Sequence, residues 1–153
     1  MRKGFRLSDY DDTIRLVLES GGEFRIYPRG TSMLPLLVQE RDSVVLKKPD
    51  GFLKKNDIAF YLRDNGQYVL HRVISCDGGK YVMCGDNQLQ LESGIEDRHI
   101  IGVVCSFNRN GKDITADSLS YKLYLLIWQS FFVRRVFFKL RRLKNVIKTK
   151  FKR

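Results

Sequence analysis

Six short runs of β-branched and aromatic residues dominate residues 24–107, and turn signals separate them. Val, Ile, Phe and Tyr favour strands, while the pairs Asn65-Gly66 and Asn110-Gly111 are typical of the tight turns that close hairpins. The runs expected to form strands are residues 24–27, 43–47, 58–62, 68–74, 81–84 and 100–107. This spacing predicts a mostly β fold: a compact antiparallel sheet that folds over on itself or forms a partial barrel.

Helices are expected only towards the two ends of the chain. Ser8 can cap a short helix that runs through Leu18, and Gly21-Gly22 can end it. The first 13 residues are polar, so neither a signal peptide nor an N-terminal membrane anchor is expected. The chain is long enough for one ordinary domain, and we expect a β-rich domain over residues 1–117 and a helical tail over residues 118–153.

Positive charge is concentrated in this tail. Residues 118–153 contain 11 of the 28 Lys and Arg residues and no Asp or Glu, so residues 1–117 are formally neutral. A neutral β region without a helix-turn-helix pattern does not favour nucleic acid as a partner, and none is expected.

Apolar residues in the tail recur at intervals of three and four, which predicts one side of a basic amphipathic helix. They are Val133, Val136, Phe137, Leu140, Leu143, Ile147 and Phe151. The densest apolar stretch, residues 123–133, would extend only about 16 Å as a helix, which is well short of a hydrocarbon core of roughly 30 Å. We therefore expect residues 121–153 to attach the protein peripherally to an anionic membrane. The alternative is a helix that docks on the β domain or on a partner protein, in a cytoplasmic protein.

Three cysteines give no sign of a cross-linked or metal-bound fold. Cys76, Cys84 and Cys105 are odd in number and have no C-x-x-C spacing, which argues against a disulfide framework and against zinc. They are expected to be small core residues, and no metal or cofactor is expected.

A serine lies in a stiff loop between two expected strands. Pro35 restricts the chain and Gly30 permits close approach of the backbone, so Ser32 can be held in one orientation beside a cleft. Such a serine is also common in ordinary turns, so the loop alone does not identify a nucleophile.

A histidine interrupts an apolar strand. His71 shares a strand face with Val69 and Val73, which predicts a partly buried imidazole. With an ordinary pKa near 6.5, a histidine can accept the proton of a serine hydroxyl at neutral pH. A carboxylate beside His71 would hold its tautomer and stabilise the imidazolium, as the third member of a triad does. Asp86 and Glu92 follow in sequence and are the candidates.

Four ordered segments carry a family resemblance. They are G-x-S-M-x-P at residues 30–35, His71-Arg72-Val73, Gly85-Asp86-Asn87 and residues 101–104. Their order resembles type I signal peptidases, in particular the branch in which a histidine in H-R-V replaces the lysine of the usual bacterial enzyme. The resemblance covers roughly residues 25–108.

The resemblance implies a role for each matching residue. Ser32 matches the family's nucleophile, His71 its general base and Asp86 the aspartate of its G-D-N box. Glu92 falls where the family often has a further aspartate proposed as the triad acid. The third catalytic member is therefore Asp86 or Glu92, with Asp86 preferred.

One position near the expected nucleophile departs from the family pattern. Gly30 stands where family members often carry a serine that helps to form the oxyanion hole. The hole is then expected to use backbone N–H groups near Ser32 with the Thr31 hydroxyl, and Gly30, Thr31 and Met33 are the expected oxyanion and substrate-binding residues. The family's N-terminal membrane helix is not expected here.

These patterns predict a signal peptidase-like serine endopeptidase, which would cleave an extended leader, signal or precursor peptide through Ser32 and His71. The alternative is a module of the same fold that binds or assembles peptides with a degenerate site.

Overall fold

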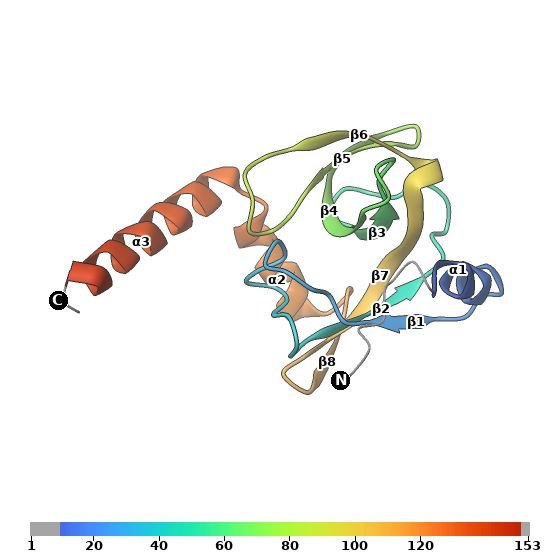
Figure 1. The fold of residues 1–153 in the computed structure, drawn as a ribbon, viewed down its shortest axis with the longest axis horizontal. Helices are drawn as coiled ribbons and strands as arrows, with labels where there is room; N and C mark the ends of the chain where they lie inside the picture. Colours follow the sequence, from blue (N-terminus) through green and yellow to red (C-terminus); the bar gives the residue numbers. More distant parts are fainter. Residues whose placement is uncertain (1–9, 151–153) are drawn as a thin grey trace.

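The computed structural model describes residues 10–150 and shows a mostly β protein with three α-helices (Figure 1). The strands are β1 (Phe24–Ile26), β2 (Ser43–Lys47), β3 (Ile58–Leu62), β4 (Tyr68–Asp77), β5 (Lys80–Cys84), β6 (Glu92–Glu96), β7 (Ile100–Arg109) and β8 (Lys112–Thr115). The helices are α1 (Asp11–Glu19), the 3-10 helix η2 (Asp97–His99), α2 (Leu119–Trp128) and α3 (Phe131–Lys150). A mostly β, antiparallel architecture is confirmed.

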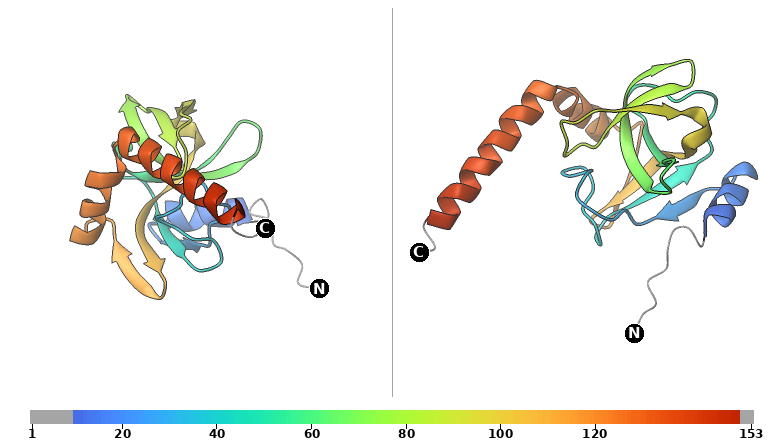
Figure 2. Two further views of the ribbon diagram at one scale, coloured as in Figure 1. Left: turned by 90° about the vertical axis from the view of Figure 1, so that its left-hand side faces the viewer. Right: turned by 45° about the horizontal axis from the view of Figure 1, so that its top comes forward.

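The strands form one open antiparallel sheet in the order β1-β2-β7-β3-β4-β5-β6, and β8 pairs with the far end of β7. The long strand β7 pairs with β2 along one edge and with β3 along the other. Register shifts interrupt the pairing of β2 with β7, of β3 with β7 and of β4 with β5. Such irregularities increase local bend and twist, which fits the strongly curved sheet in Figures 1 and 2.

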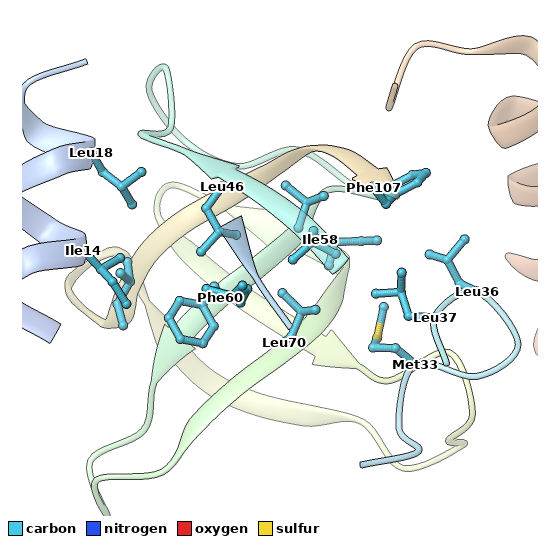
Figure 3. Packing of buried hydrophobic residues seen from close by; sticks show 14 of the residues in the cluster. Ile14, Leu18, Met33, Leu36, Leu37, Leu46, Ile58, Phe60, Leu70 and Phe107 are labelled. Atoms are coloured by element: carbon cyan, nitrogen blue, oxygen red, sulfur yellow. The ribbon is translucent and has the colours of Figure 1, made fainter. Parts of the chain in front are cut away.

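Strand β3 is buried on both faces, because the curved sheet separates two hydrophobic clusters. Ile58 and Phe60 lie in the larger cluster, while Ala59 and Tyr61 point the other way into the smaller one. The larger cluster also receives α1 and the loop after β1 (Figure 3). The two clusters explain why the sequence of β3 is almost continuously apolar rather than alternating.

Two strands lie outside the predicted runs. Strands β6 and β8 are polar and mostly exposed, with Ile95 the one buried residue of β6 and no residue of β8 fully buried. Their sequences therefore lack the apolar pattern that marks a strand. The short N-terminal helix is present as α1, and its expected cap, Ser8, lies outside the described residues.

The tail contains two helices where a single one was predicted. Ser118 caps the N-terminus of helix α2, and its side chain accepts a hydrogen bond from the Tyr121 amide. Helix α3 begins after Ser130, whose hydroxyl accepts one from the Val133 amide. A second capping serine thus divides the apolar stretch, because serine competes with the helical backbone for its hydrogen bonds.

Helix α2 packs on the β sheet, and α3 extends away from the rest of the molecule (Figures 1 and 2). Tyr121 belongs to the larger core cluster, so α2 completes the core although it lies beyond the expected boundary at residue 117. No helix in the described range is both long and apolar enough to cross a membrane. Of the three thiols, Cys84 is buried, whereas Cys76 is exposed, which contradicts its expected place in the core.

Candidate active site

A cavity of about 690 Å³ lies between the chain that leaves β1 and the near end of β4. One wall is residues 26–30, and another is residues 68–71. Strand β1 is the end strand of the sheet, and β5 pairs with β4 only from Arg72 onward. The cavity therefore lies along two strand edges that have backbone groups available for a further strand.

Four of the expected site residues are among the described residues that line this cavity: Gly30, Ser32, Met33 and His71. Thr31, Asp86 and Glu92 are not. Thr31 is exposed and is not among the described residues that line the cavity, so the structure gives no support for its hydroxyl in an oxyanion hole.

The Ser32 loop is held at its backbone. The Ser32 carbonyl accepts a hydrogen bond of 2.7 Å from the Asn87 amide, and the Thr31 carbonyl accepts one of 3.0 Å from Asn87 Nδ2. On the other side of the serine, Met33 is 4% exposed and packs in the larger core cluster with Leu36 (Figure 3). Two anchors thus hold a half-buried Ser32 at the cavity wall.

Gly30 owes its identity to backbone conformation. Its φ is +88°, a region that residues with a Cβ rarely adopt, although no atom lies within 4 Å of the place where a Cβ would be. Its amide donates a 2.8 Å hydrogen bond to Gln39 Oε1. A serine at this position would therefore be strained.

His71 is 5% exposed and is held through its Nδ1 atom. Tyr61 Oη lies 3.2 Å from that nitrogen and donates a 2.8 Å hydrogen bond to Glu92 Oε2. Because the only hydroxyl proton of Tyr61 goes to Glu92, the oxygen is left to accept a proton from Nδ1. This arrangement favours the tautomer in which Nε2 is unprotonated and can act as a base.

Glu92 is kept ionised by Arg63. The guanidinium donates from Nε to Oε1 and from Nη2 to Oε2, both at 2.6 Å. Partial burial raises the pKa of Glu92, but hydrogen bonds from Arg63 and Tyr61 outweigh it, and the net pKa is lowered. Burial lowers the pKa of His71, and the Glu92 charge, whose nearer oxygen is 3.6 Å from Nδ1, only partly opposes this.

Asp86, which was preferred as the third member of the triad, does not contact His71 and pairs with Arg72 instead. Its carboxylate receives two hydrogen bonds from Arg72, at 2.7 and 2.6 Å, and one of 2.8 Å from Tyr124 Oη. Neighbouring residues of a strand point to opposite faces of the sheet. Arg72 and its partner Asp86 therefore lie on the face opposite His71. The geometry favours Glu92 over Asp86 as the carboxylate that orients His71.

Each residue of Gly85-Asp86-Asn87 has a structural role instead. A Cβ on Gly85 would lie 2.6 Å from the Ser32 carbonyl oxygen, so only glycine fits. Asp86 joins β4 to α2, and its own carbonyl accepts a 2.8 Å hydrogen bond from Trp128 Nε1. Asn87 holds the serine loop as described above.

Tyr61 and Arg63 are site residues that the sequence did not reveal, and Asn87 stood out only as part of the Gly85-Asp86-Asn87 motif. Tyr61 and His71 lie diagonally across the β3–β4 pair, since Tyr61 is opposite Val69 and His71 is opposite Ala59. Only this register identifies them as neighbours. The continuously apolar sequence of β3 gave no signal of which residue faces His71.

No hydrogen bond between Ser32 and His71 occurs among the side chains of residues 10–142. Catalytic hydrogen bonds are often long without substrate and shorten in the complex. No protein-family model, curated protein or solved structure matches this chain.

Proposed function

We propose that this chain is a serine endopeptidase of the type I signal peptidase-like kind, with Ser32 as nucleophile and His71 as general base. One observation carries the proposal: Ser32 and His71 line the same cavity, and the Nδ1 side of the imidazole is occupied by Tyr61 and Glu92. A base needs its free nitrogen on the side of the nucleophile and a fixed partner on the other.

The proposed reaction proceeds in two steps. His71 Nε2 takes the proton of Ser32 Oγ while that oxygen attacks the carbonyl carbon of the scissile bond. The proton then passes to the leaving amine, and the peptide's acyl group stays on Ser32. Water, deprotonated by the same nitrogen, hydrolyses the ester and restores the serine. Backbone N–H groups near Ser32 would stabilise the negative oxygen of each tetrahedral intermediate.

The proposed substrate is an extended leader, signal or precursor peptide. Residues 68–71 of β4 leave one strand edge unpaired by β5, directly along the cavity. A peptide added to this edge would gain main-chain hydrogen bonds while alternate side chains enter the cavity. A mixture of extended peptides, incubated with the protein and mapped by mass spectrometry, should show discrete cuts. Uncut peptides with saturable binding would favour the degenerate peptide-binding module.

Replacing Tyr61 with phenylalanine is expected to lower kcat roughly a hundredfold with little change in KM, because the imidazole loses its link to Glu92 while the cavity wall is retained. Steady-state kinetics on a cut peptide measure both constants. Tyr81→Phe is the matched control, since Tyr81 also lies in the smaller core cluster and donates 2.7 Å to a carboxylate, that of Asp97. Equal losses of kcat in the two variants would contradict a role for Tyr61 in orienting His71.

The pH dependence of kcat/KM should report the buried histidine. The base acts only when neutral, and burial lowers the pKa of His71 from 6.5, so its neutral form persists to lower pH than that of an exposed histidine. Activity is therefore expected to rise with pH along an acid limb whose midpoint lies below 6.5. A midpoint above that value would show a histidine stabilised in its charged form, contrary to this geometry.

A further inference from the structure

Helix α2 is apolar on two opposite faces. The face towards the sheet carries Tyr121 and Trp128, which are 6% and 7% exposed. The outward face carries four residues that are more than half exposed: Leu119, Leu123, Leu126 and Ile127. A helix that is apolar on two opposite faces normally has an apolar neighbour on each, and the described chain supplies one on the inward side alone.

Helix α3 carries an exposed apolar strip of its own. Phe132, Val136 and Leu140 are spaced by four residues, lie on one helix face and are exposed. We use the name outer helix surface for the exposed apolar residues of the two helices: Leu119, Leu123, Leu126, Ile127, Phe132, Val136 and Leu140.

Exposed cations border this surface, and anionic side chains are absent from it. Arg135, Lys139 and Arg142 lie at intervals of four and three on α3, beside the apolar strip, and Lys122 on α2 is exposed as well. Residues 119–142 contain no Asp or Glu. A surface with apolar side chains flanked by cations is complementary to the interface of an anionic bilayer. Two copies that faced each other would instead bring like charges together.

The part of the outer helix surface that lies on α2 and the first turn of α3 is fixed relative to the cavity. Arg134 is fully buried in the first turn of α3 and donates 2.8 Å to the Trp128 carbonyl and 3.2 Å to the Gly85 carbonyl. Tyr124 and Trp128 bind the side chain and backbone of Asp86. The start of α3 and all of α2 are therefore joined to the segment that holds the Ser32 loop.

We propose that the outer helix surface binds an anionic lipid bilayer, with the helices lying along the interface and the β domain held beside it. This inference does not depend on peptidase activity. The apolar side chains would lie among the acyl chains of the lipid, and the cations would lie at the headgroups.

Flotation of the full chain with vesicles tests the proposal. The wild-type protein should float with phosphatidylcholine vesicles that contain phosphatidylglycerol and much less with phosphatidylcholine alone. Leu123→Glu/Leu126→Glu should weaken binding roughly a hundredfold, because two apolar anchors become charged. Arg135→Gln/Lys139→Gln should weaken it by about fivefold for each cation removed.

Leu16→Glu is the matched control, because Leu16 is 71% exposed on α1, away from these helices. It should float as the wild type does, and circular dichroism should show all variants folded, since the changed side chains are exposed. Failure of the wild type to float, or equal flotation of Leu16→Glu and Leu123→Glu/Leu126→Glu, would overturn the proposal. A wild-type dimer in sedimentation that dissociates in Leu123→Glu/Leu126→Glu would also overturn it, since the outer helix surface would then bind a second copy of the chain.

Discussion

Replacing Ser32 with alanine is expected to lower kcat for a cleaved precursor peptide by about 10⁴- to 10⁶-fold, because no other atom can form the acyl-enzyme. His71→Ala should cost a similar factor, since nucleophile and base act as one unit and their effects do not add. The double variant should therefore be no slower than either single one. Steady-state kinetics with the three variants measure this.

Ser75→Ala is the control for this experiment. Ser75 is an exposed serine on the same strand as His71 and is not among the described residues of the cavity. Its turnover should equal that of the wild type. Peptide binding should persist in Ser32→Ala, because the strand edge and the cavity walls are unchanged. Full turnover by Ser32→Ala would contradict the assignment of the nucleophile.

Replacing Asp86 with alanine is expected to lower the free energy of unfolding by about 3–5 kcal/mol, which is a large part of the stability of a domain this size. Arg72 is 1% exposed and would keep its charge without a carboxylate partner. Burial lowers the pKa of Arg72, but the ordinary pKa of a guanidinium is so high that the group stays charged after Asp86 is removed. Tyr124 would lose its acceptor too.

Urea unfolding measures this difference, and Glu19→Ala provides the comparison. Glu19 pairs with Lys48, and both side chains are more than half exposed, so its loss should cost only about 0–1 kcal/mol. A loss below about 1 kcal/mol in Asp86→Ala would show that the pair is not a main attachment of α2 to the sheet.

The sheet was largely predictable because its central strands have apolar sequences. Strand β3 is buried on both faces, and its five residues stand out in the sequence. Strand β6 pairs only with β5, at the end of the sheet, and has one buried residue, so no apolar pattern marks it. The tail was predicted as a single helix because the apolar stretch continues across Ser130. The helical conformation is interrupted there, so the tail contains two helices.

The site residues that belong to sequence motifs were predictable. Those whose contacts depend on the register between paired strands were not. Ser32 and His71 lie at one cavity, as the motif order predicts. Asp86 was preferred because it matches the family's G-D-N box, and a motif match does not show which face of the sheet a side chain reaches. Arg72 donates hydrogen bonds to Asp86. Glu92 on β6 is linked to His71 through Tyr61 on β3.

The reactivity of Ser32 towards a fluorophosphonate is the most direct test of an activated nucleophile. Intact mass and peptide mapping should find one phosphonyl group, on Ser32, with a labelling rate that rises with pH below 6.5 as His71 loses its proton. His71→Ala should lose that labelling while remaining folded. Labelling of wild type at no serine, or at the same rate in His71→Ala, would contradict a Ser32–His71 peptidase site.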